Sequence, residues 1–150
     1  ALDYIKAEQE ADGAWFGRWG VNYVYGTGAV LPALEAIGED MTQPYIRKAS
    51  DWLILHQNED GGWGESCASY MDPKQMGRGK STASQTAWAL MGLAAVGRAL
   101  ASRSDEGRLV TNFDVPESAT GVLLGCHYFL SSAFPDLLCM PFGQQCVNAR

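Results

Sequence analysis

A repeated tryptophan turn constrains this chain more than any other feature. The segments Ala1–Trp15 and Ala49–Trp63 align without a gap, and each ends in the pattern Gln-x3-Gly-x-Trp, 48 residues apart. A second match aligns Ala29–Gly38 with Trp88–Gly97 at an offset of 59 residues, and the additional residues fall in the loop-like stretch Cys67–Lys80. Self-similarity at a period of this size is typical of repeat architectures. The repeating unit is therefore a helix, a Gly-Trp turn, a connector and a second helix.

Helical signals lie on both sides of the second turn. Thr42 or Gln43 followed by Pro44 predicts a helix N-terminus, because proline suits the first helical turn. An apolar stripe of helical period follows and consists of Ile46, Ala49, Trp52, Leu53 and His56. The glycines after Asn58 are expected to end this helix, since glycine tolerates the left-handed conformation of a C-cap.

The next helix is expected over Ala83–Leu100, with Ser81 or Thr82 as its cap. It is almost uncharged until Arg98, which is typical of a helix buried between neighbours. Gly38 and Gly97 occupy matching positions, and each is expected to close its helix. No useful strand-period alternation occurs, so the predicted class is all-α, with paired-helix repeats.

The character of the chain changes at about residue 100. We expect residues 1–100 to form the repeat portion and residues 101–150 to form a divergent C-terminal segment. Residues 118–147 contain one charged residue, Asp136, and no further Gln-x3-Gly-x-Trp turn. Gly121–Leu130 is predicted to form one more short helix, and Pro135 and Pro141 prevent a long one beyond it.

Charge and composition exclude several functions. Lys and Arg number 11 against 17 Asp and Glu, a net charge of −6, which argues against nucleic-acid binding because phosphates require a basic surface. No apolar run of about 20 residues is present, so no transmembrane helix is predicted. His56 and His127 lack ligand partners at metal-binding spacing, and no phosphate-binding glycine motif occurs, so neither metal nor cofactor is expected. The four cysteines, expected to be reduced and buried thiols, are Cys67, Cys126, Cys139 and Cys146.

The polar residues of the two turns have mainly structural interpretations. The amides of Gln9 and Gln57 can donate and accept together, so they can satisfy backbone groups at a neighbouring helix end. The acidic residues beside the second turn could suggest a glycosidase carboxylate pair. Acidic residues at turns are usually solvated, and we expect this of Glu59, Asp60 and Glu65. Trp52 and Trp88, on helix faces, are expected in the core.

The ordered motifs of residues 1–100 resemble the QW repeats of triterpene cyclases, and squalene–hopene cyclases in particular. The resemblance is carried by the two turns and by the stretches Trp15–Thr27, Gly61–Ser66 and Ser81–Leu93. In that family such repeats build α/α barrels, with the substrate cavity between two of them. The resemblance therefore implies that this chain is part of an α/α barrel in a larger enzyme, a class II cyclase that folds polyenes through carbocations without a cofactor.

Further expectations follow from the resemblance. The substrate class would be squalene or a similar C30 polyprene, reached from the bilayer by an intracellular, monotopic membrane-associated enzyme. At full length the enzyme could form a homodimer. The family's acid lies in an Asp-x-Asp-Asp motif that is absent from these 150 residues, so the isolated chain is expected to be inactive. The divergent segment 121–150 is what a truncated or misread gene model would produce.

Two aromatic residues match cavity positions of the family. Trp19 would present its ring to the substrate or cation, and Tyr25 would lie near the acid and help to orient or reprotonate it. An apolar aromatic lining attracts positive charge and excludes the water that would end the reaction. The alternative is that both residues are core aromatics beside a turn, which is how we interpret their neighbour Tyr23.

Other functional classes remain open from the residues alone. A non-catalytic helical-toroid module would bind a partner on its concave face and would have a hydrophilic lining. A glycosidase barrel would need carboxylates on one inner face, and a prenyltransferase subunit would need Asp, Cys and His ligands for zinc. Within the cyclases, squalene and oxidosqualene are alternative substrates.

Overall fold

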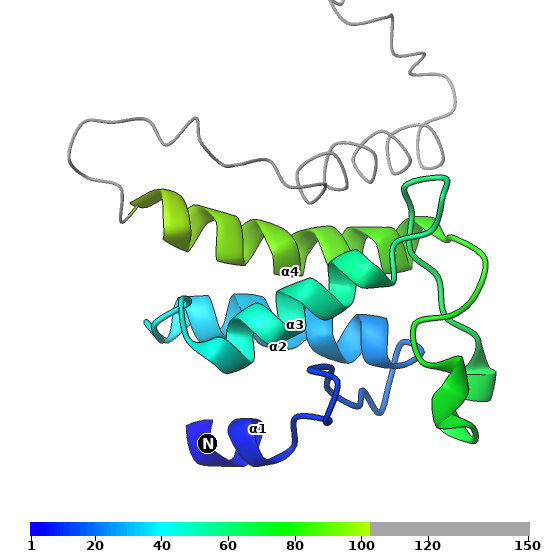
Figure 1. The fold of residues 1–150 in the computed structure, drawn as a ribbon, viewed down its shortest axis with the longest axis horizontal. Helices are drawn as coiled ribbons and strands as arrows, with labels where there is room; N and C mark the ends of the chain where they lie inside the picture. Colours follow the sequence, from blue (N-terminus) through cyan, green and yellow to red (C-terminus); the bar gives the residue numbers. More distant parts are fainter. Residues whose placement is uncertain (103–150) are drawn as a thin grey trace, which may run out of the picture.

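The structure, a computed structural model, describes residues 1–102, and its regular secondary structure is helical (Figure 1). Between the helices the chain forms turns, and the described residues contain no β-strand, only an isolated bridge between Gln9 and Trp15. The elements are α1 (Leu2–Ala7), α2 (Tyr23–Ala36), α3 (Pro44–Leu55), the 3-10 helices η1 (Cys67–Tyr70) and η2 (Pro73–Gln75), and α4 (Ala83–Ser102). The prediction of an all-α fold with paired helices is confirmed.

Helices α2 and α4 form the centre of the described fold, lying side by side with α3 against them (Figure 1). Glycines allow this close approach, because a Cβ at Gly28 would lie 2.4 Å from the carbonyl oxygen of Trp88. Gly92 faces Gly28 from α4, and its Cβ would lie 3.2 Å from the Cα of Gly28. The core between the helices includes the fully buried Leu31, Leu34, Ile46 and Leu53.

Helix α3 begins and packs as its sequence signals predict, but it ends at Leu55 with His56 as its C-cap. The prediction that the glycines after Asn58 end it is therefore wrong, because Gly61, with a φ of +83°, lies in the turn beyond the helix. Pro44 occupies the first helical turn after the N-cap Gln43, and the buried residues are four members of the predicted stripe, Ile46, Ala49, Trp52 and Leu53. The fifth, His56, lies just after the helix, where its ring stacks on that of Trp52 with a centroid distance of 4.1 Å.

The helices α2 and α4 end differently, although their sequences align. Gly38 has a φ of +77° just after α2, as a helix-closing glycine should. Gly97 instead lies inside α4, which continues to Ser102, so the prediction that it closes the helix is wrong. Among the described residues, nothing lies within 4 Å of a Cβ built on Gly97, and no local contact there interrupts the helix. Thr82 caps α4 as predicted, accepting a hydrogen bond from the backbone N–H of Gln85 (3.2 Å).

The prediction that α4 is buried on nearly all sides holds only in part. Met91 is exposed, and Arg98 reaches across to Glu35 of α2 through a two-pronged ion pair. The Arg98 guanidinium lowers the pKa of the Glu35 carboxyl through hydrogen bonding and charge. One face of α4 is therefore turned outward from the described residues.

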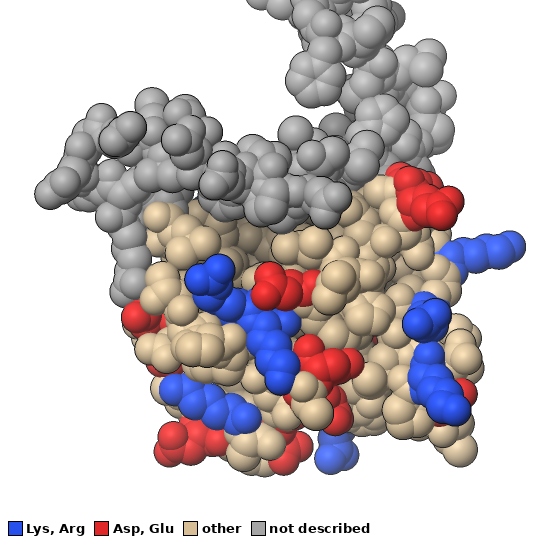
Figure 2. All heavy atoms as spheres, in the orientation of Figure 1, with Lys and Arg blue, Asp and Glu red and all other residues tan. Residues whose placement is uncertain are grey.

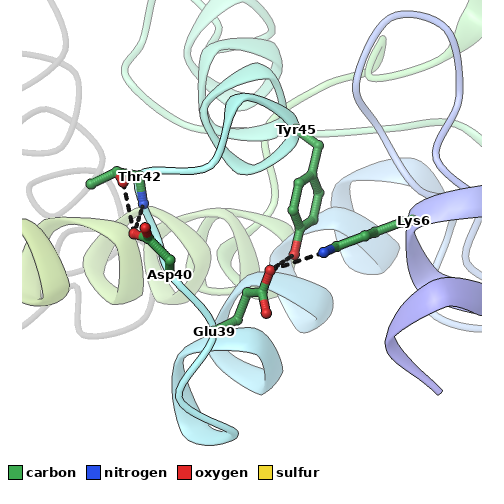
Figure 3. Close-up of polar contacts among 5 residues, drawn as sticks. All are labelled: Lys6, Glu39, Asp40, Thr42 and Tyr45. Carbon is green, nitrogen blue, oxygen red and sulfur yellow. Dashed lines mark hydrogen bonds and ion pairs between the residues drawn. The ribbon is translucent and has the colours of Figure 1, made fainter.

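Helix α1 has no fully buried residue and is held by polar contacts to the segment before α3 (Figure 3). Lys6 Nζ lies 3.1 Å from Glu39 Oε1, and the same oxygen accepts a hydrogen bond from the Tyr45 hydroxyl (3.0 Å). Beside them, Asp40 Oδ1 accepts from both the N–H and the hydroxyl of Thr42. This polar cluster joins the first helix of the chain to the second repeat.

The charges on one face of the described residues show no single dominant sign. On the face drawn in Figure 2, basic and acidic side chains are interspersed. Over residues 1–102, no helix is both long and apolar enough to cross a membrane. The helix predicted at Gly121–Leu130 and the residues His127, Cys126, Cys139 and Cys146 lie outside the described residues, as does nearly all of the segment 101–150.

Candidate functional site

The glutamines of the two turns brace the chain in the same way. The Nε2 of Gln9 donates to the carbonyl of Gly13, and the Nε2 of Gln57 donates to the carbonyl of Gly61, each at 2.7 Å. Gln9 also donates to the carbonyl of Tyr45 in the first turn of α3 (2.8 Å). Both amides thus satisfy a backbone group of their own turn, and that of Gln9 also satisfies one of a neighbouring helix, which confirms a structural role for them.

The tryptophans of the turns close a second pair of matching bonds. The indole N–H of Trp15 donates to the carbonyl of Ile5, and that of Trp63 donates to the carbonyl of Leu53, both at 2.7 Å. Each acceptor lies ten residues before its tryptophan, so each turn is tied back to the helix that precedes it. Both rings are buried.

Each turn is also tied forward, to the helix that follows the connector. The backbone N–H of Trp15 donates to Thr27 Oγ1 of α2 (3.1 Å), and that of Trp63 donates to Thr86 Oγ1 of α4 (3.0 Å). These two threonines are 59 residues apart, the second offset found in the sequence. The offset of 48 residues therefore relates the turns and the helices before them, and the offset of 59 residues relates the helices after them.

Trp19 differs from the buried tryptophans of this fold. It lies in the Trp19 loop, which we define as residues 16–22, between the first turn and α2. Its side chain is 77% exposed, whereas Trp15, Trp52 and Trp63 are at most 4% exposed. The prediction that Trp52 is a core residue is confirmed. The alternative interpretation of Trp19 as a core aromatic residue is wrong for the described residues, because its side chain is exposed.

Tyr25 lies in the first turn of α2, directly against the Trp19 loop. A Cβ at Gly20 would lie 2.7 Å from Tyr25 Cγ and 3.2 Å from Trp88 Cη2, and Gly20 has a φ of +73° that favours glycine. The rings of Tyr25 and Trp88 meet edge to face at a centroid distance of 4.9 Å. The structure therefore places the Trp19 loop, at Gly20, against the paired rings of Tyr25 and Trp88 at one end of the helix pair.

Trp88 is the aromatic residue whose environment the sequence did not indicate. We expected it in the core, but it is only partly buried and packs on Tyr25. Its position on α4 shows no pattern that distinguishes a ring packed on the Trp19 loop from a ring packed in the core. Only the close pairing of α2 and α4 brings Trp88 to this place.

Tyr23 has the packing role that we predicted. It is 5% exposed, and its ring meets that of Phe16 edge to face at 5.6 Å. Burial raises the pKa of its hydroxyl, and the nearby carboxylates of Glu10, Glu65 and Asp12 raise it further. Tyr23 is thus a core residue at the first position of α2.

The three acidic residues beside the second turn separate in the structure. Glu59 and Asp60 are exposed, as predicted, and Asp60 Oδ1 accepts hydrogen bonds from the Gly62 N–H and the Ser81 hydroxyl. Glu65 is only 7% exposed, so the prediction that it is solvated is wrong. The physical reason is that its carboxylate accepts two backbone N–H groups at the start of α2.

A hollow of about 200 Å³ lies between α1 and the beginning of α2. Phe16 and Arg18 of the Trp19 loop line it from one side, and Ile5 and Glu8 line it from α1. Neither Trp19 nor Tyr25 is part of its lining. The hollow is therefore separate from the aromatic group at the end of the helix pair.

No metal site is formed by the described residues. Within residues 1–102, no group of three or more His, Cys, Asp or Glu side chains could hold a metal ion. Cys67 is free, as expected, but it is exposed and not buried, because it begins the short surface helix η1, whose only buried residue is Ser69. His56 bonds locally, with its Nδ1 2.8 Å from the carbonyl oxygen of Trp52.

Comparison with known proteins gives a consistent result. The family model of the squalene-hopene cyclase C-terminal domain matches residues 1–141. A squalene–hopene cyclase of Alicyclobacillus acidocaldarius is 62% identical over 107 residues, which are 71% of this chain and 17% of that protein. One from Zymomonas mobilis is 57% identical over 100 residues, which cover 66% of this chain and 15% of the relative. A dammaradiene synthase of Dryopteris crassirhizoma is 50% identical over 109 residues, with 66% and 16% covered. The chain thus spans about one sixth of the length of these relatives.

Proposed function

This chain belongs to the family of the squalene-hopene cyclase C-terminal domain, and we propose that it is a segment of a class II triterpene cyclase. The complete enzyme would cyclise squalene or a similar C30 polyprene through carbocations, without a cofactor. The acid that starts the reaction would come from outside these 150 residues, since they contain no Asp-x-Asp-Asp motif. The role of this segment is to present aromatic rings to the substrate.

The observation that carries the proposal is the exposure of Trp19. A tryptophan ring that is 77% exposed forgoes the burial that stabilises Trp15, Trp52 and Trp63 in the same fold. Its loop is nevertheless closely packed, with Gly20 against the rings of Tyr25 and Trp88. An exposed ring on a well-packed support is suited to contact a ligand.

The chemistry of the reaction fits this arrangement. A carbocation is attracted to the negative face of an aromatic ring by about 0.5 to 2 kcal/mol, with the larger values in water-free sites. Trp19 would supply such a face to the substrate or to a developing cation. Tyr25, in the first turn of α2, would lie near the acid and help to orient or reprotonate it. An apolar surround would exclude the water that ends cyclisation early.

The properties of the complete enzyme are part of the same proposal. We propose that residues 1–100 contribute helix pairs to an α/α barrel and that residues 101–150 form a distinct segment. The enzyme would rest on one face of a membrane, inside the cell, and could pair as a homodimer. Exposed apolar side chains on the described surface, such as Leu55 and Met71, support contact with further protein or with lipid.

A segment exchange tests the proposal directly. The matching segment of the Alicyclobacillus cyclase is replaced by that of this chain, and conversion is measured with squalene and with oxidosqualene separately. We expect cyclised products from the exchanged enzyme and none from the isolated chain. A folded, membrane-bound exchanged enzyme that converts neither substrate would contradict the proposal. Pentacyclic product from the isolated chain would contradict the view that the segment needs the rest of the enzyme.

Substitution of Trp19 then tests its role within the exchanged enzyme. Loss of one cation–π contact predicts that Trp19→Ala lowers kcat/KM by about 2- to 30-fold, while Trp19→Phe retains more of the activity because it keeps a ring. Tyr4→Ala serves as the control, because Tyr4 is also a well-exposed aromatic residue but lies on α1. Equal losses for Trp19→Ala and Tyr4→Ala would remove the special role of Trp19.

A further inference from the structure

We propose that Glu65 and Gln85, both from the second repeat, are positioning residues that hold the Trp19 loop of the first repeat in its working shape. This inference rests on the proposed function, because it concerns how the ring of Trp19 is aimed. The second repeat would then help to shape the Trp19 loop of the first repeat, a role that the sequences of its turn and helices do not indicate. The juxtaposition that carries it is a buried carboxylate and a buried amide against the backbone of Val21, Asn22 and Val24.

Glu65 performs the capping of α2 from a distant part of the chain. Its Oε2 accepts hydrogen bonds from the backbone N–H groups of Asn22 (3.1 Å) and Val24 (2.8 Å), which lie 43 and 41 residues away in sequence. The first N–H groups of a helix have no acceptor within the helix, and negative charge is favoured at this end. One oxygen of the Glu65 carboxylate is therefore matched to the start of α2, whereas its Oε1 is buried and has no hydrogen-bond partner among the described residues.

The usual capping residue is occupied elsewhere. Asn22 is the N-cap of α2, but its side chain makes no cap hydrogen bond. Its Oδ1 instead accepts the backbone N–H of Gly17 (3.0 Å) and so closes the Trp19 loop on itself. With Asn22 engaged inside the loop, the cap hydrogen bonds at the start of α2 come from Glu65.

Gln85 completes the connection from α4. Its Nε2 donates to the carbonyl of Val21 (2.9 Å), and its Oε1 accepts the backbone N–H of Glu65 (2.6 Å). Gln85 is 5% exposed, and its bond to Glu65 is buried, while its bond to Val21 is partly buried. The Gln85 amide thus binds two backbone segments at once, the Trp19 loop at Val21 and the connector of the second repeat at Glu65.

The loop needs this support because of its backbone conformation. Val21 has a φ of +44°, a region that β-branched residues rarely adopt. Such a conformation persists only where surrounding contacts impose it, and such residues concentrate at functional sites. Val21 lies two residues after Trp19, so a change in its conformation would turn the Trp19 ring in a new direction.

The first experiment measures the loop itself, in the 150-residue chain. Amide hydrogen exchange is compared between the unaltered chain, Glu65→Ala, Glu65→Gln and Glu59→Gln, the last being an exposed control of the same type. We expect the amides of Asn22 and Val24 to exchange at least about tenfold faster in Glu65→Ala, because their acceptor is removed. Glu65→Gln keeps an acceptor oxygen and should restore part of the protection. Unchanged exchange in both Glu65 variants would overturn the proposal.

The second experiment measures the consequence for catalysis, in the segment-exchanged cyclase described above. A displaced ring predicts that Glu65→Ala lowers kcat by about 10- to 100-fold, with a smaller change in KM and a larger share of incompletely cyclised products. Gln85→Ala should shift the products in the same direction. Thr86→Val is the matched structural control, since it weakens the second turn without touching the Trp19 loop, and it should leave the product pattern unchanged.

The outcomes separate the two proposals. If the unaltered exchanged enzyme is inactive, the proposed function fails, whereas hydrogen exchange in the 150-residue chain still decides whether Glu65 holds the loop. If Glu65→Ala yields no folded enzyme, Glu65→Gln and Gln85→Ala are measured in its place. Product patterns identical to the unaltered enzyme in these folded variants would overturn the positioning role.

Discussion

The two tryptophan turns share their internal bonds but differ in what they connect. In both, the glutamine amide donates to the turn glycine, the indole N–H is tied to the preceding helix, and the tryptophan backbone is tied to a threonine of the following helix. The first turn follows α1, which buries no residue, whereas the second follows α3, which buries four. One device therefore serves both a helix that packs weakly and a helix that is firmly placed in the core.

The connectors after the turns show the larger difference. After Trp15 the chain reaches α2 through the short Trp19 loop, while after Trp63 it takes the longer route through η1 and η2 to α4. The longer connector contains Glu65, which reaches back to the start of α2. The two turns therefore share one pattern of hydrogen bonds, and the two repeats differ in the length and the contacts of their connectors.

The largest expected effect is the removal of a turn tryptophan. Trp63→Ala should lower the free energy of unfolding by about 3–5 kcal/mol, because a fully buried ring and its indole hydrogen bond are both lost. Trp15→Ala should cost less, since the indole N–H of Trp15 is tied to α1, which buries no residue, whereas that of Trp63 is tied to α3, which buries four. Urea denaturation of the 150-residue chain, followed by circular dichroism, measures both values. A larger loss for Trp15→Ala would reverse the assigned difference between the turns.

Substitution of Thr27 and Thr86 tests whether the two turns depend equally on their hydrogen bonds to the following helices. Thr27→Val and Thr86→Val each remove the acceptor of a buried tryptophan N–H, and each should destabilise the chain by about 1–3 kcal/mol. Valine keeps the side-chain volume, so packing changes little. Near-equal losses in denaturation experiments would support equivalence. A loss confined to one variant would show that only that turn depends on its threonine.

The aligned glycines Gly38 and Gly97 should respond with opposite signs. Gly38→Ala places a side chain at a φ of +77° and should cost about 1–2 kcal/mol. Gly97→Ala adds a methyl group inside α4, in open space, and should stabilise the chain by about 0.5–1 kcal/mol. Thermal melting of the two variants measures the contrast. Destabilisation by Gly97→Ala would contradict the position of this residue inside a continuous helix.

The smallest expected effect concerns the polar contacts of α1. Tyr45→Phe removes the hydrogen bond to Glu39 and should cost about 1 kcal/mol or less at neutral pH. Burial, the hydrogen bond to Glu39 and the charge of Glu39 together raise the pKa of Tyr45 above the ordinary value of 10.0. A raised pKa contributes stability that is fully present below the unfolded value and is lost as pH rises above it.

The pH profile provides the readout for this residue. Stability of the unaltered chain should fall above about pH 10, where the unfolded chain loses its Tyr45 proton first. The fall should be smaller in Tyr45→Phe, measured by urea denaturation across this range. Tyr4→Phe is the control, since Tyr4 is exposed. Identical profiles for the unaltered chain and Tyr45→Phe would show that Tyr45 does not contribute.

The local sequence predicted most of the helices and turns because their signals are local. Pro44 and the stripe from Ile46 predicted α3, and the two offsets predicted a repeated turn between helices. The threonine partners of the turns, Thr27 and Thr86, were found only in the structure. Gly97 was misassigned because an aligned glycine does not by itself state the sign of its φ. Glu65 was misassigned because its burial depends on N–H groups more than 40 residues away.

Some residues of the candidate site were also predicted from the sequence, and others were found only in the structure. Trp19 and Tyr25 were found from the sequence through their resemblance to cavity positions, and their roles remain predictions. The repeat period, the helical class and the turn residues were determined by the sequence alone, since spacing and conformational preference act over a few residues. The support of the Trp19 loop by Glu65, Gln85 and Trp88 was decided only by the tertiary structure. Those contacts join segments with no common local pattern, and they exist only because α2 packs against α4.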